Sequence, residues 1–330
     1  MEAPSDLSEF PGPRIGPGEP GLAPVFPLVL LASVLIAVAL VAYTSAAIRT
    51  PAAQFIQAAY APEAAMIAWA PRDDAEKQVY AIGDFTITLS THIHKNGERA
   101  AQLSVRAPSG EPTSIYGQVG FPIPAAKFGV GKLDRLSDTR QIVLTTYSGG
   151  LHCCTRVTVL DLVGGKWRKV QLGLWDGEPL PEFPRDADGD GTADFVFTDD
   201  RFDYAFAPYS DSHKPPRIFN VERGRVVEVG HEPRFDAVYE ADMKHAHGGC
   251  LRHKNAACAA FVADAARLDR LDWAWKIMLA NYRPSTDWDF PIKCKVAKVD
   301  GLCPPGQTEQ FREFPDALAW FLSDTRYMKQ

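Results

Sequence analysis

Alternating and β-branched runs fill the middle of the chain, between about residues 81 and 231. Most of these runs alternate apolar with polar residues, or are rich in Val, Ile and Thr, as strands of a half-buried sheet do. They are 85–90, 102–106, 141–147, 156–160, 167–172, 195–197, 217–221 and 225–229. Turn sequences such as Lys95-Asn96-Gly97 and Gly164-Gly165 separate them. We therefore predict an antiparallel β domain over residues 81–231.

The last hundred residues change to helical spacing. Apolar side chains recur every three or four positions over 255–267, 271–282 and 316–327, and Pro315 stands where a first-turn proline favours a helix start. The segment 284–314 has no such period and holds Cys294 and Cys303. We predict a small α-helical, disulfide-containing subdomain over 232–330.

The N-terminal part predicts a membrane anchor. Residues 1–24 are rich in Pro and Gly, and we expect a disordered tail. Phe26–Ile48 contains no charged residue and is long enough to cross a bilayer, which predicts a transmembrane helix over 25–48 and a single-pass protein. A cleaved signal peptide is the alternative, with Ser45-Ala46-Ala47 as small cleavage-site residues. The acidic tail, whose one basic residue is Arg14, favours the retained anchor.

Residues 49–80 are rich in Ala and Pro and predict a linker, with one short helix around Gln54–Tyr60. Six cysteines follow it, and Cys250/Cys258 and Cys294/Cys303 are close enough in sequence to form local disulfides. Disulfides persist in oxidising compartments, so we expect a bacterial inner-membrane protein with its C-terminal body in the periplasm. The net charge of −6 gives no basic stripe that would indicate a nucleic-acid partner.

One loop carries a candidate metal site. Asp186, Asp188, Asp190 and Asp194 occupy positions 1, 3, 5 and 9 of a nine-residue run, with Gly191 at position 6. Oxygen ligands at this spacing suit calcium, and Thr192 would add its backbone carbonyl. A plain Asp/Gly turn is the alternative. An EF-hand does not fit, because Phe197 stands where a bidentate Glu is required and a strand follows.

This loop, leading into the apolar strand 195–198, resembles the calcium loops of FG-GAP or VCBS-type repeats, which integrin α propellers also carry. The segment 128–146 repeats the pattern of 183–198 without most of the ligands. With 147–154, 199–206 and 314–322, these motifs resemble uncharacterised bacterial envelope proteins. The resemblance implies a cell-envelope location and calcium, but no activity, and leaves a partial propeller or a β-sandwich open as the fold.

A second motif supports a different hypothesis. His152-Cys153-Cys154, with His245, His247 and Cys250, offers thiolate and imidazole groups for a periplasmic redox or copper-handling protein. His92 and His94 share one face of a predicted strand. For the cysteines, the simpler interpretation is that they form structural disulfides. For the histidines, it is that they are polar surface residues.

The chain contains no nucleophile elbow, phosphate-binding loop or complete dinucleotide fingerprint. We expect the acidic residues Asp199, Asp200 and Asp203 to support the calcium loop. We therefore predict a calcium-stabilised binding module or accessory subunit of a membrane protein complex, with a protein partner in the cell envelope, more than an enzyme.

Overall fold

The computed structural model describes residues 58–150 and 154–328. These described residues all belong to one compact unit. The predicted tail and the predicted span Phe26–Ile48 lie outside the described residues. Within the described ranges, no helix combines the length and the apolar character that a membrane crossing needs.

The described chain contains three larger sheets, which are antiparallel apart from one parallel pair, β1 with β3. The first sheet has the order β1 (Ala59–Tyr60), β3 (Lys77–Ile82), β4 (Phe85–Ile93), β5 (Arg99–Arg106), β6 (Thr113–Val119). The second has the order β10 (Lys166–Trp175), β9 (Thr155–Val163), β8 (Gln141–Tyr147), β7 (Ala125–Gly131), β2 (Ile67–Trp69). The third has the order β11 (Phe195–Thr198), β12 (Pro216–Glu222), β13 (Arg225–Glu228). The predicted antiparallel β region is confirmed.

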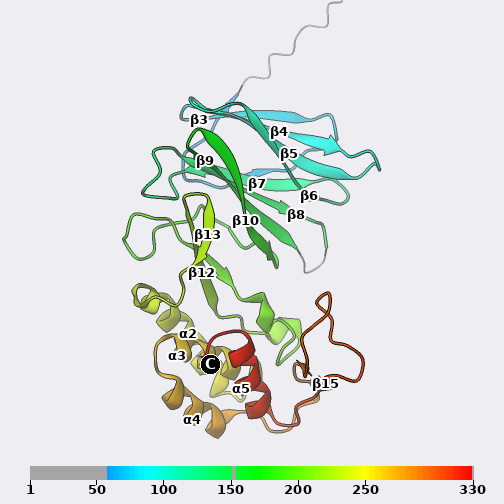
Figure 1. Ribbon diagram of the computed structural model, residues 1–330, viewed down its shortest axis with the longest axis vertical. Coiled ribbons are helices and arrows are strands. Elements are labelled where there is room, and N and C mark those ends of the chain that lie inside the picture. The colour runs from blue at the N-terminus through cyan, green and yellow to red at the C-terminus, as the bar shows by residue number, and fades with distance from the viewer. Residues whose placement is uncertain (1–57, 151–153, 329–330) are drawn as a thin grey trace, which may run out of the picture. The chain divides into compact units, whose positions relative to one another are not determined.

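The second sheet is the middle layer, because both of its faces are buried. On β8, Ile142 and Leu144 pack into a core shared with the first sheet, whereas Val143 between them packs into a core shared with the third sheet. Successive side chains of a strand point to opposite faces, so a strand covered on both sides must be apolar at consecutive positions. Figure 1 shows the strands of the first and second sheets in stacked layers, which is the sandwich arrangement.

The outer strand β4 shows the contrasting one-sided pattern. Phe85, Ile87 and Leu89 are buried at every second position, while Thr86 between the first two is exposed. Only one face of this sheet packs on the shared core, where Tyr80 meets Phe128 edge to face with ring centroids 4.9 Å apart. This burial is the main stabilising term of the two-sheet core.

The C-terminal region is helical, as predicted. Its α-helices are α2 (Asp236–Cys250), α3 (Asn255–Arg267), α4 (Leu271–Asn281) and α5 (Phe314–Asp324), and a short hairpin of β14 (Lys293–Cys294) and β15 (Thr308–Glu309) lies between the last two. Helix α3 is buried over almost its whole length and supplies much of this core; Figure 1 shows it among the other C-terminal helices. Phe202, Ala205 and Phe206, from the segment after β11, complete the core.

Both local disulfides predicted from spacing are present. Cys250, at the end of α2, is bonded to Cys258 in α3, and Cys294 in β14 is bonded to Cys303 in the loop before β15. The first joins two consecutive helices, and the second closes the long loop between α4 and α5.

Some element predictions differ from the structure. The described part of the expected linker 49–80 contains β1, β2 and most of β3, and Ala59–Tyr60, assigned to a short helix, pairs as a strand with Tyr80–Ala81. Helix α2 was not predicted, because Gly248-Gly249 and its mixed charges obscure the apolar period. The helices expected at 255–267 and 271–282 are confirmed as α3 and α4.

A matched pair of leucines tests the burial of the middle sheet against the first sheet. Leu144→Ala should lower the free energy of unfolding by about 3 kcal/mol, since it leaves a cavity where the side chain is 1% exposed. Leu174→Ala, on β10 and 53% exposed, should cost less than about 1 kcal/mol. Urea unfolding measures both, and equal losses would contradict the layer arrangement.

Candidate functional site

The Asp-rich loop is closed at its base by backbone pairing. Asp194 donates its backbone N–H to the Arg185 carbonyl at 2.8 Å, which brings the two ends of the loop together just before β11. Gly189 and Gly191 have φ of 82° and 88°, a region that side chains disfavour. Ala193 also donates to the Leu133 carbonyl at 2.7 Å, so the loop is bonded to the corresponding turn of the sequence repeat.

The carboxylates Asp186, Asp188 and Asp194 converge. Within the described ranges they form the one group of three or more His, Cys, Asp or Glu side chains whose ligand atoms all lie within 4.8 Å of one another. Oxygens bound to calcium lie 2.3–2.6 Å from the ion, so two ligands on opposite sides are about 5 Å apart. The donor set is all oxygen, as a hard cation requires. The three carboxylates therefore fit calcium in spacing and in chemistry.

Asp190 and Thr192, the other expected ligands, are placed differently. Asp190 accepts the Thr192 N–H through Oδ1 at 2.7 Å and directs Oδ2 to the Arg234 guanidinium at 2.6 Å. Thr192 is buried. Arg234 also lies 2.9 Å from Oδ2 of Asp188, so one cation of the chain itself already neutralises part of the loop. Sequence analysis missed Arg234 because it lies 44 residues beyond Asp190.

The loop's own amides hold the carboxylates in place. Asp186 accepts N–H groups from Gly189 and Gly191 at 2.7 and 2.8 Å, and these bonds, led by the one from Gly191, hold its pKa below the usual value. Asp194 accepts from Ala187 and Asn220. Burial nevertheless raises the pKa of Asp194, and repulsion from Asp188 and Asp186 adds to this rise. The site therefore has an excess of negative charge.

A second polar cluster surrounds Lys214, and no sequence motif indicated it. The ammonium lies 3.1 Å from Asp176, 3.1 Å from Asp203 and 3.7 Å from Asp200. Burial raises the pKa of both Asp200 and Asp203. Tyr209 donates to Asp176, and this bond raises the pKa of Tyr209 to about 12.

This cluster corrects one prediction. Asp200 and Asp203 bind Lys214, and the fully buried Asp199 binds Arg201 and accepts from the Tyr327 hydroxyl at 3.0 Å. These bonds tie the segment after β11 to β12 and to the chain end. Within the described ranges, none of these three carboxylates is bonded to the Asp-rich loop.

The redox or copper alternative depends partly on residues 151–153, which lie outside the described residues. Cys154 is disulfide-bonded, and Cys250 is bonded to Cys258, so its sulfur is not a free thiolate. His247 stacks on Phe261 with centroids 4.8 Å apart. His92 and His94 do lie side by side, with centroids 4.7 Å apart.

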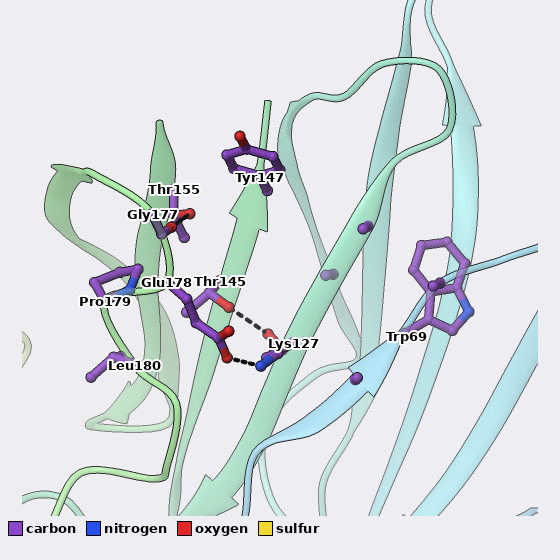
Figure 2. A pocket seen from close by; sticks show the side chains of 13 residues that line it. Trp69, Lys127, Thr145, Tyr147, Thr155, Gly177, Glu178, Pro179 and Leu180 are labelled. Atoms are coloured by element: carbon purple, nitrogen blue, oxygen red, sulfur yellow. Dashed lines mark hydrogen bonds and ion pairs between the residues drawn. The ribbon is translucent and has the colours of Figure 1, made fainter. Parts of the chain in front are cut away.

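An apolar cavity of about 340 Å³ lies at the strands β2, β7 and β8 and the segment 177–180. Its lining is largely Ala, Pro, Leu and aromatic side chains. Figure 2 shows Lys127 and Glu178 pointing toward one another as an ion pair, with Pro179 and Leu180 beyond them. The cavity thus offers apolar surface with one pair of charges.

The chain is similar to a known family model and to two curated proteins. Residues 236–326 match the family model described as sll0997 C-terminal domain. A curated protein of Synechocystis, named "Probable thylakoid lumen protein sll0997", is 30% identical over 216 residues, which are 63% of this chain and 62% of the relative. "Uncharacterized protein y4bJ" of Sinorhizobium fredii is 29% identical over 204 residues, 59% of this chain and 31% of the relative.

The chain thus spans less than two thirds of the length of these curated relatives. No solved structure matches the chain.

Replacing Lys214 tests the charge compensation of the second cluster. Lys214→Met should destabilise the fold by about 3 kcal/mol at pH 7.5, because it leaves three partly buried carboxylates without a counter-ion. Asp200 and Asp203 have raised pKa values in the folded state, so they take up protons as the pH falls and their repulsion disappears. The loss should therefore be smaller at pH 5.

Urea unfolding of the variant and the parent at both pH values measures this difference. Lys254→Met is the matched control, because Lys254 pairs with Asp211 at an exposed site and should contribute less than about 1 kcal/mol. A loss for Lys214→Met that did not change with pH would contradict the electrostatic explanation.

Proposed function

We propose that this chain is an extracytoplasmic calcium-binding protein, anchored in the membrane by residues 25–48, which acts as a binding module or accessory subunit of a membrane protein complex. The observation that carries the calcium part is the convergence of Asp186, Asp188 and Asp194 within 4.8 Å. Three mutually repelling carboxylates held by loop amides are stabilised when a divalent cation neutralises them. The FG-GAP-like character of the loop is part of the same proposal.

Two features support the extracytoplasmic compartment. The two local disulfides fit an oxidising environment, since cytosolic thiols are kept reduced. The relative in Synechocystis is named as a probable protein of the thylakoid lumen, which also lies outside the cytoplasm. External calcium at millimolar concentration would fill a weak loop of this kind.

The cavity near Lys127 supports a binding role. Its apolar lining and single ion pair provide the combination by which proteins hold ligands or partner side chains. It lies at strands of the middle sheet, which is buried on both faces and therefore provides a rigid base.

Calcium should raise the melting temperature of the full chain in mild detergent, and EGTA should lower it. Asp188→Asn removes one charge, and we expect at least about ten times more calcium for the same protection, equivalent to 1.4 kcal/mol. Asp73→Asn is the matched control, because Asp73 also accepts a backbone N–H two residues ahead but lies outside the loop. Equal melting temperatures in calcium and EGTA would refute the proposal.

Arg234→Gln provides an independent test. The guanidinium contacts Asp188 and Asp190, so its loss should destabilise the calcium-free protein and leave the calcium-bound protein less affected. The stabilisation by calcium should therefore be larger in this variant than in the parent. A smaller stabilisation would show that Arg234 assists calcium binding, which would contradict the expectation that its guanidinium replaces part of the ion's charge in the calcium-free protein.

The anchor has its own test. Full-length chain recovered from bacterial membranes should resist an alkaline carbonate wash and retain the mass of residues 26–48, because an apolar span of this length partitions stably into the bilayer. A variant lacking 26–48 should be absent from the washed membranes. A shortened mass in a soluble fraction would support the cleaved signal peptide.

A further inference from the structure

A second cavity, of about 430 Å³, is lined by four arginines from four different parts of the fold. Arg201 belongs to the short helix η1 (Asp200–Phe202) after β11, Arg217 to β12, Arg267 to the end of α3, and Arg326 follows α5. They are far apart in sequence, so only the packing of the helices on the third sheet brings them together. Glu228 and Asp324 are the acidic side chains in the lining.

Two of the arginines already have carboxylate partners. Arg201 is 2.5 Å from Asp199 and donates to the Thr325 carbonyl at 3.0 Å. Arg217 forms two bonds with Glu228, at 3.0 and 2.8 Å. Burial alone would raise the pKa of Glu228, but Arg217, with Arg201 and Arg267 nearby, outweighs it and lowers that pKa. The pairs Arg201–Asp199 and Arg217–Glu228 are part of the structure around the cavity, and each is close to neutral in net charge.

The other two arginines differ. No carboxylate of the described ranges lies within ion-pair distance of Arg267 or Arg326. The Arg267 guanidinium stacks on the Tyr327 ring at 4.5 Å, and its Nε is buried with no hydrogen-bond acceptor.

A larger cavity, of about 1100 Å³, adjoins this one and shares Arg267, Arg326 and His231 with it. Its lining includes the apolar side chains of Leu268, Leu271, Trp273 and Met328, together with Arg270 and the carboxylates Asp236, Asp269 and Asp272. The two cavities together thus present unpaired guanidinium groups next to apolar surface.

We propose that these cavities bind an organic oxyanion, with a phosphate monoester on an apolar or aromatic body as the chemical class that fits best. Arg267 and Arg326 offer two guanidinium groups to an anionic head, against one carboxylate of the smaller cavity's lining, Asp324, that has no ion-pair partner within the described ranges, and arginine binds phosphate oxygens through paired N–H donors. The apolar body would lie along Leu271 and Trp273. This site is separate from the calcium loop and does not depend on the proposed function.

Calorimetric titration of the full chain in mild detergent with EGTA tests the site without calcium. Phenyl phosphate is the main probe, inorganic phosphate lacks the apolar body, and benzoate carries a single charge, all at one ionic strength. We expect saturable millimolar or tighter binding of phenyl phosphate, about tenfold weaker binding of the other two, and competition by inorganic phosphate.

Arg326→Gln should weaken phenyl phosphate binding at least tenfold, since it removes charge-assisted hydrogen bonds, which are roughly twice as strong as those between neutral groups. Arg326 is exposed, so this variant should fold normally. Arg225→Gln is the matched control, because Arg225 is exposed on the neighbouring strand β13 and lies outside both linings. Absence of saturable binding, or equal affinities of the two variants, would overturn the proposal. Tighter binding of benzoate would overturn its phosphate part.

Discussion

Compensation of buried negative charge is the constraint on which the arrangement of this chain depends. Fully or nearly buried aspartates occur in the β region and in the helical region, and each must be neutralised or hydrogen-bonded. Asp134 accepts the backbone N–H of Arg223, and Asp199 binds Arg201. Asp264, whose two oxygens have no hydrogen-bond partner, has a pKa raised well above its usual value by burial and then by Asp242. Burial therefore favours the neutral form of Asp264, while burial and then repulsion among the carboxylates of the Asp-rich loop raise the pKa of Asp194.

The fold was predictable where one physical signal dominates. Strand β4 alternates because one face is buried, and β8 is continuously apolar because both faces are buried, so both segments were recognised from sequence. Strand β1 has two residues, and its pairing with Tyr80–Ala81 joins segments about twenty residues apart in sequence. A local sequence pattern therefore could not predict it. Helix α2 depends on packing against α3 and on the bond between Cys250 and Cys258, which override its two glycines.

The candidate sites also differ in how far the sequence alone could predict them. The carboxylates of the Asp loop are close in sequence, and their spacing alone indicated oxygen ligands for one cation. Tertiary structure brings Arg234, at the start of the helical region, to the Asp-rich loop. It also brings Lys214 to its ion-pair partners Asp176 and Asp203. The four arginines that line the cavity proposed to bind an anion come from elements spread over more than a hundred residues. Single-sequence analysis finds contiguous motifs and cannot find such assembled ones.

The core of the helical region includes residues from outside that region. Phe202 and Phe206 fill space between α3 and α5, and Asp199 accepts the hydroxyl of Tyr327. The family model matches only 236–326, which excludes those phenylalanines. A fragment cut at residue 236 would lose both rings and expose the hydrophobic socket that they occupy. The boundary of the sequence family and the boundary of the cooperative folding unit therefore do not coincide.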